Sequence, residues 1–297
     1  PCYTTVMFET FCQETGLRDD IRFAMERLFS EHRDQRLVQE AEQACARRDQ
    51  DAFSSSLSRA LDLYGPVYPL VLLGLCYDIT RRFYPDDAIR TATLSDIAVW
   101  EDRYECCHGI IGLDRVRWVA RHACGRIWRL GRLQYEFSPY PFSNVISLDE
   151  ERNVFHVTDM PVTGWKCIEK KGMDAVRLHI PEGGKLLPSL VDDSLMQASA
   201  FFPWALLVVC DSWLLDPNLE IVCQDSPNIL SFMRRFAKFP IKEEGEPQIF
   251  ERVFFFGATK ADVLVYPCRT PLQRRVQDAV RRGVEFHTTG GFVKLIR

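Results

Sequence analysis

The sequence predicts an α+β (mixed α/β) protein with an all-helical N-terminal domain followed by a domain built on a mixed sheet. Three observations support this fold class. The chain has 297 residues, enough for about two domains. Apolar residues recur with the helical period as far as Leu130, whereas from Arg132 they alternate with polar residues as in a half-buried strand. We therefore expect a boundary between residues 131 and 132, giving domains over 1–131 and 132–297.

The first domain is expected to contain about five helices, since apolar residues share one face of a 3.6-residue period in each segment. Gly65 and Pro66 stop one helix, and Asp86 and Asp87 favour the N-terminus of another. The predicted helices span residues 17–29, 52–63, 70–83, about 95–111 and 114–130.

The second domain is expected to alternate strands and helices. Residues 205–210 form a continuous apolar run, which is typical of a strand buried on both faces. Thr270 and Pro271 open a helix that Gly283 ends. The predicted strands are 132–137, 153–158, 174–180, 205–210, 250–256, 284–288 and 292–296, and the predicted helices are 188–202, 226–236 and 270–281.

Charge and composition exclude several classes of protein. The net charge is -4 and no basic stripe is visible, which argues against a nucleic-acid-binding protein. The most apolar stretches, 66–77 and 198–210, are shorter than the roughly 18 residues that a membrane span needs. The 11 cysteines are odd in number and form no Cys-x-x-Cys pair, which indicates reduced thiols in a cytoplasmic protein.

One cluster of cysteines and histidines raises the question of a metal site. Cys106, Cys107 and His108 are followed by His122 and Cys124. Adjacent cysteines point in different directions on a helix, so helix packing is the favoured interpretation over a zinc site. We expect no metal.

Five short segments carry a resemblance that runs through the chain in order. They are RLGRLQYE (129–136), LHIPEGG (178–184), CDSWLLDP (210–217), SPNI (226–229) and TPLQRR (270–275). With these segments the chain resembles bacterial GNAT-like acyltransferases that join a helical N-acyltransferase N-terminal domain to a GNAT-like C-terminal domain. The resemblance implies transfer of an acyl group from acetyl-CoA or another acyl-CoA to an amine. The acceptor would be a small molecule or a peptide, and the oligomeric state stays open.

The chain departs from the family pattern at two places. The family usually has His where this chain has Asp211. The phosphate-loop signature of the wider superfamily, Arg/Gln-x-x-Gly-x-Gly/Ala, is absent, and Glu182-Gly183-Gly184-Lys185 occupies its place. The missing signature, together with the lack of a tyrosine within residues 228–238, supports a rival interpretation, a non-catalytic acyl-CoA-binding or peptide-binding module that keeps the fold. A further alternative is thioester hydrolysis.

The resemblance implies that the CoA pyrophosphate binds between the strand over 174–180 and the helix that follows. Gly183 and Gly184 lie there, flanked by Ile180 and Lys185, and glycine lets a backbone approach a phosphate closely. The alternative is a Gly-Gly turn that only reverses the chain.

The acceptor amine must lose a proton before it attacks, so a general base is needed near these strand ends. His179 is the first candidate and Glu182 the second, although a strand histidine bonded to its neighbours is an open alternative. Asp211 can orient the amine, and Ser212 can bind it or protonate the leaving thiolate, unless both serve only local turn bonds.

The substrate pocket is expected to include Arg177, Trp213 and Asn228. Trp213 is expected to pack against the helical domain, and walling an acyl pocket is the alternative. The tyrosine that usually protonates the leaving thiolate has no counterpart within residues 228–238. A nucleophilic Cys210 is less favoured than a buried structural thiol, because it closes an apolar run.

Overall fold

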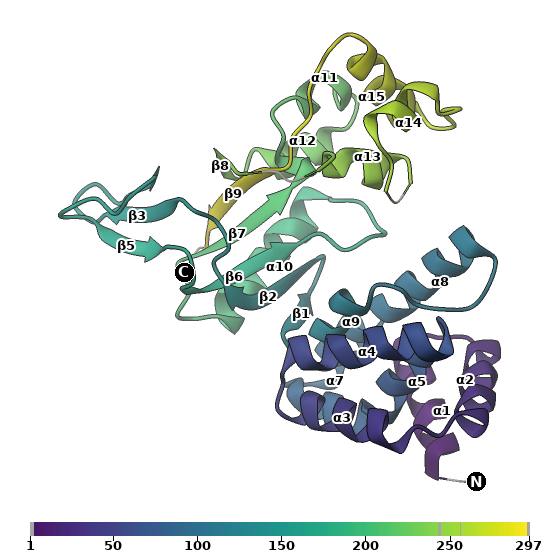
Figure 1. The fold of residues 1–297 in the computed structure, drawn as a ribbon. Coiled ribbons are helices and arrows are strands. Elements are labelled where there is room, and N and C mark those ends of the chain that lie inside the picture. Colours follow the sequence, from purple (N-terminus) through teal and green to yellow (C-terminus); the bar gives the residue numbers. More distant parts are fainter. Residues whose placement is uncertain (1–2, 243–244, 256, 296–297) are drawn as a thin grey trace. The chain divides into compact units, whose positions relative to one another are not determined.

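The computed structural model describes residues 3–242, 245–255 and 257–295. The chain divides into two compact units, which we describe separately (Figure 1). The helical unit comprises Pro1–Leu130 with Gln134–Glu136, and the sheet unit comprises Gly131–Leu133 with Phe137–Arg297. In the part of the chain that the structure describes, no helix has the length and apolar character needed to cross a membrane.

The helical unit is organised around one buried helix. Helix α5 (Tyr68–Leu75) is buried along its whole length and packs against five other helices of this unit. The other helices are α1 (Tyr3–Thr15), α2 (Asp19–Glu31), α3 (Gln35–Ala46), α4 (Gln50–Tyr64), α6 (Tyr77–Thr80), the 3-10 helix η1 (Arg81–Phe83), α7 (Asp87–Leu94), α8 (Asp96–His108) and α9 (Val116–Ala123).

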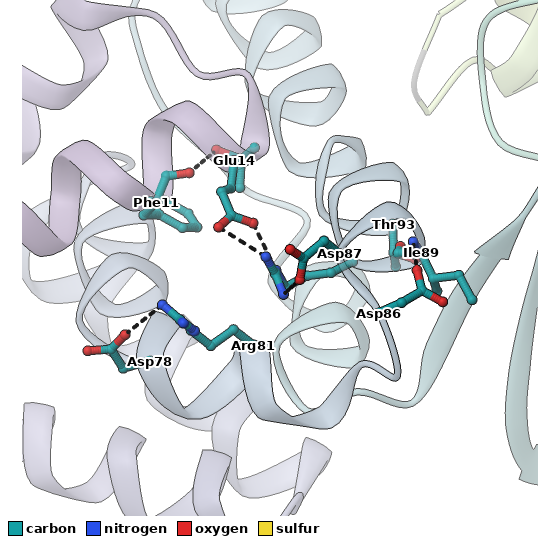
Figure 2. Close-up of polar contacts among 10 residues, drawn as sticks. Phe11, Glu14, Asp78, Arg81, Asp86, Asp87, Ile89 and Thr93 are labelled. Atoms are coloured by element: carbon teal, nitrogen blue, oxygen red, sulfur yellow. Dashed lines mark hydrogen bonds and ion pairs between the residues drawn. The ribbon is translucent and has the colours of Figure 1, made fainter.

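Aspartate side chains begin three of these helices. Asp34, Asp49 and Asp86 each accept a hydrogen bond from a backbone N–H in the first turn, which satisfies a donor that the helix itself leaves unpaired. Figure 2 shows the Asp86 cap and, separately, the carboxylate of Glu14 near Asp87. This carboxylate accepts two bonds from the Arg90 guanidinium at 2.8 and 3.1 Å. This pair joins α1 to α7. Burial raises the pKa of Glu14, but the bonds from Arg90 outweigh it and the pKa is lowered.

Two of the predicted helices differ in the structure. The segment 70–83 is divided into α5, α6 and η1. The helix expected over 114–130 ends at Ala123, and Ile127–Leu130 is a strand, β1. Gly125 explains the break, because its φ is +58° and a Cβ there would lie 2.4 Å from the Cβ of Phe83. Helices α1 and α3 were not predicted.

Within the described residues, two sheets contain nine strands. The predicted fold class, a helical N-terminal domain followed by a mixed-sheet domain, is confirmed. The order of the larger sheet is β1-β2-β6-β7-β9-β8, and that of the smaller sheet is β4-β3-β5. The remaining strands are β2 (Leu133–Pro139), β3 (Val145–Asp149), β4 (Val154–Thr158), β5 (Lys166–Glu169), β6 (Asp174–His179), β7 (Leu207–Ser212), β8 (Ala237–Pro240) and β9 (Thr289–Lys294).

The small sheet covers one face of the larger one. Ile146 of β3 packs in one buried apolar cluster with Ala175 of β6, Val209 of β7 and Phe292 of β9. This cluster lies at the start of β6 and β7. Toward the carboxyl ends of these strands, the same face carries polar side chains.

The helices of the sheet unit follow and separate these strands. They are α10 (Pro188–Phe201), η2 (Trp213–Leu215), α11 (Leu219–Val222), α12 (Pro227–Met233), α13 (Gln248–Val253), α14 (Lys260–Val265) and α15 (Pro271–Arg281). Helix α15 begins with a reciprocal capping box between Thr270 and Gln273, which confirms the start predicted there.

Two predicted strands are wrong. Within 250–256, the described residues to Val253 belong to helix α13; Phe256 lies outside the described residues. The segment 284–288 is not a strand in the structure. Its backbone groups form hydrogen bonds with side chains from elsewhere in the chain. His287 N–H donates to Asp216 Oδ2 at 2.7 Å, and Glu285 C=O accepts from Asn218 Nδ2 at 2.7 Å.

Candidate active site

The central feature of the sheet unit is the opening between β6 and β7. These strands run parallel. Within the described residues, one pair of residues is in register between them, Arg177 opposite Val209. By contrast, β7 pairs with β9 along its whole length, from Leu207 opposite Lys294 to Ser212 opposite Thr289 (Figure 1). Within the described residues, the regular pairing between the two parallel strands is therefore much shorter than that between β7 and β9.

Polar side chains from both strands meet at this opening. Arg177 Nη2 donates to Asp211 Oδ1 at 2.7 Å, and the two side chains are 17% and 26% exposed. His179 is two residues beyond Arg177, so it lies on the same face of β6. His179 is half-buried. The structure thus brings three predicted residues, Arg177, His179 and Asp211, to one face of the opening.

The loop after β6 contains the predicted phosphate-binding residues. Gly183 and Gly184 have φ of +77° and +68°, a region that other residues rarely adopt. Both glycines and Lys185 are exposed, whereas Ile180 is half-buried. Glu182, the second candidate base, lies 3.5 Å from the guanidinium of Arg252 in α13. Helix α10 begins directly after the loop, and Leu187 at its N-cap supplies no side-chain cap to its first N–H groups.

Arg132, which the sequence reasoning did not select, holds this loop. Its guanidinium donates to Pro181 C=O at 3.0 Å, to Gly184 C=O at 3.0 Å and to Lys185 C=O at 3.3 Å. The available signal was its place in the RLGRLQYE segment. Its partners are backbone carbonyls about 50 positions away, so side-chain patterns do not reveal them.

The residues at the end of β7 and after it are more buried than the glycine loop. Ser212 is 5% exposed, and its hydroxyl accepts the Leu214 N–H at 3.1 Å, which is the local turn bond considered as its alternative role. Trp213 N–H donates to Gln248 Oε1 at 3.4 Å. Asn228 lies in the first turn of α12, which packs against η2, the turn that contains Trp213.

Two alternative chemistries find no support in the described residues. Cys210 is 1% exposed, and burial raises the pKa of its thiol well above the ordinary value, which disfavours the reactive thiolate. Cys106 and Cys107 are exposed while His122 and Cys124 are buried, and no group of three or more described His, Cys, Asp or Glu side chains could hold a metal.

Comparisons with solved structures give the same fold. An acyltransferase mutant in complex with octanoyl-CoA matches over 97% of this chain and 87% of its own, with 23% identity and a TM-score of 0.69. An acyltransferase in complex with CoA and 10C-teicoplanin covers 97% of this chain and 99% of its own, with 22% identity and a TM-score of 0.61. An acyltransferase in complex with decanoyl-CoA covers 88% and 77%, with 22% identity and a TM-score of 0.62. A comparison with curated proteins found no significant match.

Family models match both parts of the chain. The N-acyltransferase N-terminal domain matches residues 8–125, and the GNAT-like C-terminal domain matches residues 127–293. The second match alone spans more than half of the chain, and the two together confirm the resemblance inferred from the five short segments. The chain therefore belongs to the acyltransferase family that joins an N-acyltransferase N-terminal domain to a GNAT-like C-terminal domain.

Proposed function

We propose that this chain transfers an acyl group from acyl-CoA to the amine of a small-molecule or peptide acceptor at the opening between β6 and β7. Family membership makes it a GNAT-type acyltransferase that uses acyl-CoA; the acceptor and the residues that act are our proposal. One observation carries it: the described pairing of these parallel strands is limited to Arg177 and Val209, and β6 leads directly into a glycine loop and the start of α10.

The opening and the loop suit the two halves of CoA. Backbone groups freed where two parallel strands separate can bond the amides of the pantetheine arm. The pyrophosphate would lie on the N–H groups of the loop and of the first turn of α10, where the helix dipole favours an anion. Gly183 keeps the approach open, because nothing lies within 4 Å of the position its Cβ would occupy. Lys185 and Ile180 flank this site.

The chemistry requires a base, an oriented amine and a leaving thiol. We assign the base to His179, which takes the proton as the amine nitrogen forms its bond to the thioester carbonyl carbon. Collapse of the tetrahedral intermediate breaks the C–S bond and releases the CoA thiolate. Asp211, held by Arg177, would bind the amine. Glu182 and Ser212 are the remaining candidates for proton transfer, and Trp213 and Asn228 for the substrate pocket.

The acceptor class follows from the neighbours. One solved acyltransferase was crystallised with CoA and 10C-teicoplanin, and another with decanoyl-CoA and teicoplanin. We propose an amine on a small molecule or a peptide for this chain too, with a medium-length acyl chain. We also propose a cytoplasmic location, because every cysteine in the described part of the chain is a free thiol.

The first test is binding of acyl-CoA. Calorimetry with octanoyl-CoA, acetyl-CoA and free CoA is expected to give dissociation constants in the micromolar range. Gly183→Val should weaken octanoyl-CoA binding at least tenfold, because a side chain would enter the phosphate site and strain a positive φ. Gly172→Val is the matched control, since Gly172 has a φ of +87° and equally open surroundings outside the site. Equal effects of the two variants, or no binding by the wild type, would reject the proposed site.

The second test concerns the base. His179→Ala is expected to lower the rate of CoA release in the presence of an acceptor amine by about 10²–10⁴-fold. Octanoyl-CoA affinity should stay within twofold of the wild type. His156→Ala is the control, because His156 lies on β4 and stacks on Trp165. Unchanged turnover in His179→Ala would remove His179 as the base.

A second function, acyl-CoA binding without turnover, is favoured by one observation. The position where the family usually has His holds Asp211, whose carboxylate is engaged by Arg177 at 2.7 Å. Tight octanoyl-CoA binding with no CoA release across a panel of amines would support this function. Release of CoA that does not depend on any amine would instead indicate thioester hydrolysis.

A further inference from the structure

Three carbonyl groups of the loop after β6 are held on one side by a single guanidinium. Arg132 uses its Nη1, Nη2 and Nε atoms to bond Pro181, Gly184 and Lys185, at 3.0, 3.0 and 3.3 Å. A guanidinium is planar, permanently charged and rigid, so three bonds from it fix the orientation of the peptide groups that accept them.

That orientation has a consequence for the opposite side of the loop. In a trans peptide, the C=O of one residue and the N–H of the next point in opposite directions. The peptide groups held by Arg132 therefore direct the N–H groups of Glu182, Lys185 and Leu186 away from the guanidinium. Several N–H groups directed the same way form a concave site for an anion.

Arg132 is itself fixed to the helix that completes this anion site. The neighbouring Leu133 N–H donates to Ser194 Oγ at 3.1 Å, and Ser194 is fully buried on α10. The residue that orders the loop and the helix that follows the loop are thereby tied together. The guanidinium also places a full positive charge beside the loop, which favours a bound phosphate.

We infer that Arg132 is a positioning residue for the CoA pyrophosphate: it orders the loop so that the N–H groups of Glu182, Lys185 and Leu186 face the phosphates. The inference rests on the proposed function. On this inference, Arg132 contributes to the part of the acyl-CoA affinity that comes from the phosphates. It contributes nothing to the part that comes from the pantetheine arm or the acyl chain.

The test compares two acyl donors that differ in the phosphates. Octanoyl-CoA carries the pyrophosphate, and octanoyl-pantetheine lacks it together with the adenosine. Arg132→Met is expected to raise the dissociation constant of octanoyl-CoA at least tenfold and to leave that of octanoyl-pantetheine within twofold. Arg132→Lys keeps the charge but loses the three-bond geometry, so we expect a rise of at least threefold for octanoyl-CoA alone. If Arg132→Met does not fold, Arg132→Lys carries the test.

The control is Arg275→Met, because Arg275 of α15 bonds Asp225 at 2.6 Å and belongs to the same unit. It should leave both affinities unchanged. If the Arg132 variants lost affinity equally for both acyl donors, Arg132 would have a merely structural role and the inference would be overturned. Unchanged affinity for octanoyl-CoA would overturn it as well. A wild-type protein that fails to bind octanoyl-CoA would overturn the proposed function itself, and this result is read before any variant is compared.

Discussion

At the scale of single residues, the most consequential polar group outside the site is Asp96 in the helical unit. It is 3% exposed and accepts hydrogen bonds from Trp100 Nε1 at 3.1 Å and Trp118 Nε1 at 2.6 Å. His122 Nε2 lies 3.3 Å from the same carboxylate, and His122 Nδ1 lies 3.0 Å from Trp118 C=O. A buried carboxylate with this many donors stabilises the unit while it is ionised.

The pKa of Asp96 makes this contribution depend on pH. Burial raises its pKa, but the bonds from His122 and the two tryptophans outweigh burial, so the pKa is lowered from 3.8. A group whose pKa is lowered by folding stabilises the protein above its unfolded pKa, and this stability is lost as the pH falls through the folded pKa.

We expect Asp96→Asn to lower the free energy of unfolding by about 2–4 kcal/mol at pH 7, because it removes the charge from a buried carboxylate that accepts two tryptophan N–H bonds. The deficit should shrink as the pH falls from the unfolded pKa through the folded pKa, since the wild-type carboxyl becomes protonated over this range. Urea unfolding at pH 7 and near pH 3 measures both values. Asp102→Asn, an exposed position on the same helix, should change little. A deficit independent of pH would contradict the assigned charge.

Residue-scale prediction is possible where the residue type itself carries the signal, and the roles assigned on that basis stay predictions. Gly183 and Gly184 stand out because their type is rare in strands and common where φ is positive, and His179 because it shares a face with Arg177. Arg132 could not be found this way. It acts through backbone carbonyls of Pro181, Gly184 and Lys185, and every residue type has a carbonyl.

At the scale of elements, segments with a clear face or cap were predictable. Helix α15 has both, with Thr270 at its cap and one buried side, and β7 is buried on both faces from Leu207 to Cys210, as the apolar run there indicates. The strand expected over 250–256 failed because Ile249 and Phe250 are buried side by side on a helix, and a short apolar run fits either structure. The pattern within a segment cannot decide such cases.

Other elements depended on partners that lie far along the chain. Residues 284–288 have strand-like side chains, but Asp216 and Asn218 take their backbone bonding groups. The end of helix α9 depends on Phe83, which lies against Gly125. In both cases the deciding contact is between residues more than 40 positions apart, so it became visible only in the structure.

At the scale of the whole molecule, the proposed site predicts which segments of the chain acyl-CoA contacts. Everything assigned to acyl-CoA lies in the sheet unit: the ends of β6 and β7, the loop over residues 181–185 and the start of α10. A ligand that binds only the native state reduces exchange in the segments it contacts and stabilises the fold by mass action.

We therefore expect hydrogen exchange with octanoyl-CoA to slow in the loop over 181–185 and at the start of α10. At a concentration about 100 times the dissociation constant, amides that exchange only from the unbound state should slow by up to about 100-fold. Octanoyl-pantetheine should protect the ends of β6 and β7 but not the loop, because it lacks the phosphates. Helices α3 and α4 serve as the internal reference. Protection confined to the helical unit would place the ligand elsewhere and overturn the assignment of β6, β7 and α10 together.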